Sequence, residues 1–97
     1  MNEIDLSGQV AVVTGGAQGL GLAIARRIAG SGASVCLWDV NEAQLARAAS
    51  DIGPAAAAQV VDITDAEAVM AALAATEARL GPVSILVNSA GIAGPNH

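Results

Sequence analysis

The sequence has no tyrosine, no phenylalanine and no lysine, and it has a single cysteine. One cysteine, Cys36, cannot form an internal disulfide, which is consistent with the reducing cytoplasm where we expect this protein. Its place in the middle of an apolar run predicts a small buried side chain rather than a nucleophile. The four basic residues are all arginines, and the formal net charge is −5. This balance argues against nucleic acid as a partner, because phosphate backbones are bound by clustered Lys and Arg.

Long apolar runs are also absent. The best stretch, residues 20–28, is interrupted by Arg26 and Arg27, whereas a membrane span needs about 20 apolar residues. No basic segment followed by an apolar one opens the chain as a signal peptide would. No cluster of residues has the spacing of metal ligands. We therefore expect neither a membrane partner nor a metal ion.

Small aliphatic residues dominate what is present. Hydrophobic residues make up 54% of the 97 residues, and Trp38 is the one aromatic side chain among them. Alanine, valine, isoleucine and leucine in these proportions suit helices packed on a buried parallel sheet. A chain of this length forms one domain at most, and no linker or internal repeat divides it.

Strand and helix patterns alternate along the chain without a break. Apolar runs predict strands at residues 10–13, 34–38, 59–61 and 83–87, while the alanines at 55–58 are ambiguous. Helical periodicity follows each of the first three strands, and glycines at or just after the helix ends stop it. The order β-α-β-α-β-α-β predicts an α/β fold of the Rossmann type, a doubly wound parallel sheet with strand order 3-2-1-4. The sheet stops after the fourth strand, which leaves an apolar edge uncovered.

The helices carry start signals and apolar faces of their own. In the first helix, Leu20, Ile24 and Ile28 are four residues apart and are predicted to face the sheet. Asn41 is a good N-cap for the second helix, which buries Leu45, Ala49 and Ile52. The segment Thr64-Asp65-Ala66-Glu67 has the form of a capping box at the start of the third helix.

A glycine-rich turn joins the first strand to the first helix. In Thr14-Gly15-Gly16-Ala17-Gln18-Gly19-Leu20-Gly21, glycines stand at 15, 19 and 21. Gly15 lets the chain leave the strand, Gly19 lets a phosphate approach the backbone, and Gly21 lets the helix pack closely. The first N–H groups of the helix would then point at a pyrophosphate. A motif of this kind alone can also be a tight turn with no ligand.

Acidic residues follow the second and third strands. Asp39 can accept hydrogen bonds from both adenosine ribose hydroxyls of a dinucleotide and would repel a 2′-phosphate, which favours NAD over NADP. The alternative for Asp39 is a solvated cap of the second helix. Asp62 either meets the adenine amino group or helps to cap the third helix.

Together these features resemble the short-chain dehydrogenase/reductase family over the whole chain. The resemblance includes the turn at 14–21, Asp39, the Asp62-Ile63 pair and Asn88-Ser89-Ala90-Gly91, where serine replaces the second asparagine of the family's Asn-Asn-Ala-Gly signature. The replacement removes one amide from the crevice wall. The resemblance implies an NAD site made by these residues: Gly15, Gln18, Gly19, Leu20, Gly21, Asp39, Asp62, Ile63, Asn88, Ala90 and Gly91.

The resemblance also implies an activity, namely hydride transfer between nicotinamide and an alcohol or ketone, in a protein that is a homo-oligomer when complete. The loop at 91–96 resembles those of members that act on sugars, polyols or 3-oxoacyl thioesters. The family's catalytic Tyr-x-x-x-Lys pair, with its Ser and Asn, is missing, so residues 1–97 are expected to be the N-terminal dinucleotide-binding part of one domain and not catalytic alone.

Two alternatives stay open. A non-enzymatic dinucleotide-binding module would bind without turnover, although the uncovered edge of the fourth strand argues against it. A Rossmann-like methyltransferase also carries an acid after the second strand. The glycine spacing and Asn88-Ser89-Ala90-Gly91 argue against that reading.

Overall fold

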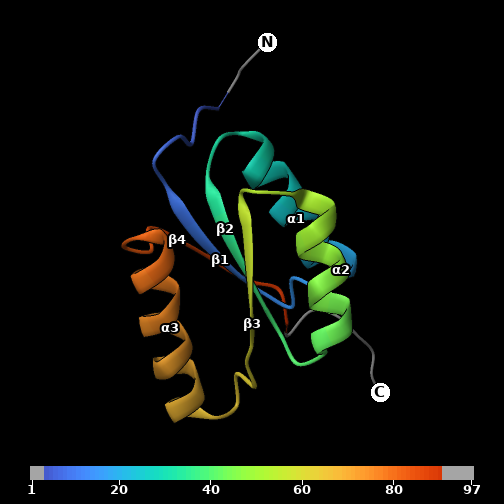
Figure 1. The fold of residues 1–97 in the computed structure, drawn as a ribbon, viewed down its shortest axis with the longest axis vertical. Helices are drawn as coiled ribbons and strands as arrows, with labels where there is room; N and C mark the ends of the chain where they lie inside the picture. Colours follow the sequence, from blue (N-terminus) through green and yellow to red (C-terminus); the bar gives the residue numbers. More distant parts are fainter. Residues whose placement is uncertain (1–3, 91–97) are drawn as a thin grey trace.

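The computed structural model describes residues 4–90, which form one parallel sheet between two layers of helices (Figure 1). The sheet has the spatial order β3-β2-β1-β4 and every pair is parallel, so the predicted fold and strand order are confirmed. Strands and helices alternate in the order β1 (Val10–Thr14), α1 (Gly19–Gly30), β2 (Ser34–Asp39), α2 (Glu42–Ile52), β3 (Ala56–Val60), α3 (Ala66–Leu80) and β4 (Ile85–Asn88).

Both faces of the central strands β1 and β2 are covered, which explains their continuous apolar sequences. Helices α1 and α2 lie on one face and α3 lies on the other (Figure 1). Because side chains alternate along a strand, Val13 and Leu37 join the core beneath α1 and α2. Val12, Cys36 and Trp38 join the core beneath α3. Cys36 is 1% exposed, and burial raises the pKa of its thiol, which confirms it as a buried small side chain.

The third strand differs from the prediction, because it begins in the alanine segment rather than at Gln59. Ala56 is paired with Val35 and Ala58 with Leu37 on β2. Alanine has little strand preference of its own, so the pattern of 55–58 was ambiguous. Backbone pairing with β2 decides the matter. Alternate alanines then pack into the two cores, with Ala57 on the α3 side.

The fourth strand begins two residues later than predicted. The Val83 N–H donates to Glu77 Oε2 at the end of α3 (2.8 Å), so this group belongs to the helix–strand connection. The Ser84 N–H and hydroxyl both donate to the Val10 carbonyl oxygen, before regular pairing starts. At this edge of the described sheet Leu86 is 67% exposed.

Helix α1 is rotated relative to the prediction, of which only Ile28 packs against the core as expected. Leu20 is 57% exposed and Ile24 is only half-buried. The buried positions are Gly21 and Ala25, with Leu22 packed beside them. The helix is turned in this way because Gly21 has no side chain and can lie against the β1–α1 turn, a contact that hydrophobic periodicity cannot detect.

Of the two predicted helix caps, the one for α2 is confirmed and the one for α3 is wrong. Asn41 caps α2 as predicted, since its side chain accepts the Gln44 N–H (2.9 Å). The capping box predicted for α3 is wrong. Asp65 is the N-cap and accepts two N–H groups of the first turn, while Thr64 bonds to Asp62 instead. An aspartate is a better acceptor than threonine here, because its carboxylate also interacts with the positive end of the helix dipole.

Trp38 and Thr76 form a buried polar contact between β2 and α3. The Trp38 indole N–H donates to Thr76 Oγ1 (3.2 Å), and the Thr76 hydroxyl donates to the Ala72 carbonyl oxygen (2.7 Å). Thr76→Val keeps the shape but leaves the indole N–H without an acceptor. We expect it to lower the free energy of unfolding by about 1–3 kcal/mol, measured by urea denaturation. Thr64→Val, on the exposed surface, is the control, and equal effects of the two variants would contradict this account.

Within residues 4–90, no helix combines the length and the apolar character that crossing a membrane requires. Gly91 and the loop at 91–96, for which a substrate resemblance was noted, lie outside the described residues.

Candidate functional site

The turn after β1 brings the ends of three strands together. Gly15 has φ +66°, a backbone conformation that favours glycine, and its N–H donates to the Trp38 carbonyl oxygen (2.8 Å). A Cβ added at Gly15 would lie 2.9 Å from Ala90 Cα. The turn therefore lies directly against the segment that follows β4, with no room for a side chain between them.

The N-terminus of α1 is open. Within residues 4–90, no protein acceptor is bonded to the N–H groups of Gly19, Leu20 and Gly21. Gln18 occupies the N-cap position, but its side chain makes no cap hydrogen bond. Gly19 has φ +59°, and a Cβ there would meet no atom within 4 Å, so it would project into open space. Free N–H groups and the positive end of the helix dipole make this terminus suitable for an anion.

Gly21 is in the opposite situation, since there is no space at all beside it. A Cβ added there would overlap the Gly15 carbonyl oxygen and lie 2.5 Å from Ser89 Oγ. Ser89 is itself buried, and its hydroxyl donates to the Thr14 carbonyl oxygen. The close packing expected of Gly21 is present, but its partners are the glycine turn and the end of β4 rather than the face of the sheet.

Asp39 lies beside the turn at the end of β2. Its Oδ2 accepts the Ala17 N–H (3.1 Å), and its Oδ1 accepts the Val40 N–H (2.8 Å). The alternative role as cap of the second helix is wrong, because Asn41 caps α2. A carboxylate has about four lone-pair sites, so both oxygens keep capacity for further donors.

These residues line one hollow at the carboxyl ends of β1, β2 and β4, with a volume of about 490 Å³. Its lining contains seven of the predicted site residues together with Ser89: Gly15, Gln18, Gly19, Leu20, Gly21, Asp39 and Ala90. Asp39 supplies the one charged side chain of the lining within residues 4–90. In a doubly wound sheet the ligand crevice is expected where the strand order reverses, here between β1 and β4, and the hollow lies at that point.

Three other predicted residues lie outside the lining of this hollow. Asn88 is exposed, and its Oδ1 accepts the Thr14 hydroxyl (2.8 Å), which ties β4 to β1. Asp62 accepts the Thr64 N–H and hydroxyl, and these bonds lower the pKa of its carboxyl; it does not cap α3. Ile63 is 40% exposed next to it.

Sequence reasoning missed one residue that lines the hollow, Ser89, and one exposed residue outside its lining, Val40. Ser89 was seen as a lost amide, whereas its buried hydroxyl joins the ends of β1 and β4. The available signal was the need for a small side chain where Gly15 and Gly21 both approach. Val40 had no signal beyond its place after Asp39, yet it is 66% exposed at the same end of the sheet as Ile63.

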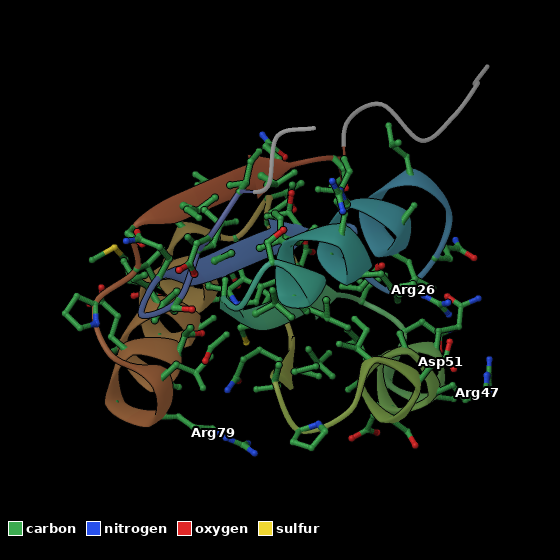
Figure 2. All side chains as sticks on the ribbon, turned by 90° about the horizontal axis from the view of Figure 1, so that it is seen from above. Arg26, Arg47, Asp51 and Arg79 are labelled. Atoms are coloured by element: carbon green, nitrogen blue, oxygen red, sulfur yellow. The ribbon has the colours of Figure 1, made fainter. Side chains whose placement is uncertain are left out.

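The arginines lie apart from the lining of the hollow. Arg26 on α1 forms an ion pair with Asp51 on α2, and Arg47 lies on the same helix as Asp51 (Figure 2). Arg79 lies on α3, on the other face of the sheet (Figure 2). Arg26 and Asp51 are each more than half exposed, so their pair contributes little to stability.

A family model described as short chain dehydrogenase matches residues 9–97. The chain belongs to this family. It is 56% identical over 89 residues to galactitol 2-dehydrogenase (L-tagatose-forming) of Cereibacter sphaeroides, covering 91% of this chain and 35% of that protein. It is 46% identical over 88 residues to 2-dehydro-3-deoxy-L-rhamnonate dehydrogenase (NAD(+)) of a Sphingomonas species, covering 91% and 35%. This short-chain dehydrogenase sequence thus spans about a third of the relatives it matches.

A solved structure agrees with the fold of this short-chain dehydrogenase chain. The 3-ketoacyl-(acyl-carrier-protein) reductase from Brucella melitensis, complexed with NADH, superposes with a TM-score of 0.82 at 40% identity. The match covers 84% of this chain and 34% of that one. The family match and the superposition therefore agree on one Rossmann-type fold for this chain.

Proposed function

We propose that this chain is the NAD(H)-binding part of a short-chain oxidoreductase that transfers a hydride between nicotinamide and an alcohol or ketone. The observation that carries the proposal is the hollow in which the free N–H groups at Gly19 and Leu20 stand beside the Asp39 carboxylate. When bound, NAD supplies the hydride chemistry, and the protein supplies binding and orientation.

The residues present fit a dinucleotide. The pyrophosphate would be held by the N-terminus of α1, where Gly19 leaves the backbone uncovered. The adenosine ribose hydroxyls would donate to Asp39, whose oxygens keep free lone pairs. Val40 and Ile63 offer exposed apolar surface for the adenine ring at the ends of the neighbouring strands β2 and β3, and Asp62 offers an acceptor for its amino group.

The charge of the hollow favours NAD over NADP. Asp39 is negative, and no arginine lines the hollow within the described part of the chain. A 2′-phosphate would therefore meet a like charge without a compensating cation. The relative named for NAD(+) and the solved reductase bound to NADH support the same choice of cofactor.

The family's Tyr-x-x-x-Lys residues for proton transfer do not occur in this sequence, which has no tyrosine and no lysine. We propose that they belong to the part of the family domain that these residues do not span, and that the complete protein is a cytoplasmic homo-oligomer. The sugar-alcohol and 3-ketoacyl names among the matched proteins support a polyol, sugar or 3-oxoacyl substrate. The 67% exposed Leu86 supports a larger domain over a finished binding module.

Substitution of Asp39 tests the cofactor site in the protein expressed from its complete gene. We expect Asp39→Ala to weaken NAD binding about 10- to 100-fold, because charge-assisted hydrogen bonds to the ribose are lost. The affinity for NADP should fall less than the affinity for NAD, so the ratio of the two affinities moves closer to one. Titration calorimetry with both cofactors measures the two affinities.

The control for this test is Glu67→Ala, which removes an equal charge from the exposed start of α3, on the other face of the sheet. Asp39→Asn separates charge from geometry, since its amide oxygen can still accept the Ala17 N–H. Unchanged affinities for both cofactors in Asp39→Ala would remove this residue from the site.

A further inference from the structure

Two glutamines connect the glycine turn to α2. The Gln44 Nε2 donates to Gln18 Oε1, with 3.1 Å between the two atoms. Gln18 is the N-cap residue of α1, and Gln44 lies in the first turn of α2. The backbone of Gln44 is held as well, because its N–H donates to Asn41 Oδ1. The side-chain bond therefore joins the N-termini of two neighbouring helices.

Gln18 is the member of this pair that lies near Asp39. The Asp39 carboxylate accepts the N–H of Ala17, the residue before Gln18. Gln18 and Asp39 both line the hollow described above. Gln44 lines a separate hollow of about 790 Å³ on the side of α2, where Ala17 and Leu22 are also part of the wall. The hydrogen bond between the two amides thus links a residue that lines the candidate cofactor hollow to one that lines this second hollow.

The hydrogen bond to Gln44 also keeps the Gln18 side chain from capping α1. Gln18 stands at the N-cap position, yet its side chain makes no hydrogen bond to the first turn of α1. Its amide oxygen is instead occupied by Gln44. The helix end therefore stays open toward the hollow, and a neutral side chain is held at the rim.

We propose that Gln44 is a positioning residue for cofactor selectivity, acting through Gln18. This inference rests on the proposed function, because it assigns NAD to the hollow beside Asp39. With the adenosine ribose at Asp39, an added 2′-phosphate needs room next to this carboxylate. The paired amides occupy that rim and present no cation to the phosphate. Selectivity for NAD then depends on steric exclusion by the paired Gln18 and Gln44 side chains as well as on the charge of Asp39.

Three variants of the complete protein separate the steric effect of the paired glutamines from the electrostatic effect of Asp39. Gln44→Leu keeps the bulk of residue 44 but cannot donate, so Gln18 is released from the rim. Gln44→Glu still pairs with Gln18, whose own amide N–H can donate to the new carboxylate, and it adds a negative charge. Gln18→Ala removes the Gln18 amide itself. Gln9→Leu is the control, since Gln9 is an exposed glutamine just before β1, at the opposite end of that strand.

The measured quantity is the ratio of the dissociation constants for NADP and NAD, from titration calorimetry. We expect Gln44→Leu to lower this ratio about three- to tenfold, the size of effect that one hydrogen bond supplies. Gln44→Glu should keep NAD affinity and raise the ratio. Adding Gln44→Leu to Gln18→Ala should change nothing further, because Gln44 acts only through Gln18.

The outcomes distinguish this inference from the proposed function. In one outcome, the unaltered protein binds NAD while Gln44→Leu and the Gln9→Leu control have the same ratio of NADP to NAD dissociation constants. That result would overturn the inference and leave the proposed function standing. A further change when Gln44→Leu is added to Gln18→Ala would also overturn it. Absence of NAD binding by the unaltered protein would overturn the proposed function and this inference with it.

Discussion

Replacement of Gly19 by valine is expected to lower NAD affinity about 100-fold or more, equivalent to about 2.7 kcal/mol, while the helical content stays nearly unchanged. The Cβ of residue 19 points into the open space of the hollow, where nothing lies within 4 Å. A branched side chain there would occupy the place of the phosphate and cover the free N–H groups of α1. Titration calorimetry and far-ultraviolet circular dichroism on the protein from its complete gene measure the two effects.

Gly8 offers a matched control for this prediction. Gly8 has φ +84° and Gly19 has φ +59°, and a Cβ would meet no neighbour at either position. A side chain in this backbone conformation costs about 1–2 kcal/mol at each position, so the two variants share the same strain. Gly8 lies before β1, at the amino end of the strand, away from the hollow. If Gly19→Val keeps the NAD affinity of Gly8→Val, the phosphate is not bound at this turn.

Replacement of Gly21 by alanine is expected to lower the free energy of unfolding by about 2–3 kcal/mol. Alanine is the better helix former, so helix propensity alone predicts a gain in stability of about 1 kcal/mol. Packing opposes this gain and is the larger effect. The new Cβ would overlap the Gly15 carbonyl oxygen, which belongs to the backbone of a tight turn and cannot move aside as a flexible side chain could. Urea denaturation followed by circular dichroism measures the change.

The other end of the same helix supplies the control. Gly30 is the last residue of α1, and a Cβ there would meet nothing within 4 Å. Gly30→Ala should therefore be neutral or stabilise by up to about 1 kcal/mol. The two variants make the same chemical change in one helix, but their expected effects on the free energy of unfolding differ in direction. Equal stability of Gly21→Ala and Gly30→Ala would show that the turn can yield at Gly15.

The contrast between Gly19 and Gly21 shows how far the glycine motif could be interpreted from sequence. The spacing predicted both positions and a separate reason for each. The sequence could not show that Ser89, rather than the face of the sheet, is one neighbour of Gly21. Ser89 lies 68 residues further along the chain, and only the pairing of β1 with β4 brings it to the turn.

The mistakes at β3 and α3 have a common physical origin. Alanines at 56–58 form a strand because the backbone of β2 offers hydrogen bonds, and a local pattern contains no information on that partner. At α3 the motif offered two acceptors, Thr64 and Asp65. The structure uses Asp65 as the cap because Thr64 is bonded to Asp62. Both outcomes depend on competition between hydrogen-bond partners, which only the folded chain resolves.

The sequence by itself determined the alternation of strands and helices, the strand order and the placement of a glycine turn and an acid at one end of the sheet. These properties follow from hydrophobic periodicity, glycine chemistry and the handedness of parallel crossovers, all of which are local or general. Only the tertiary structure decided the inward face of α1, the role of Ser89 and the hydrogen bond between Gln18 and Gln44. These depend on contacts between residues distant in sequence, whose distances are set by how the whole chain packs.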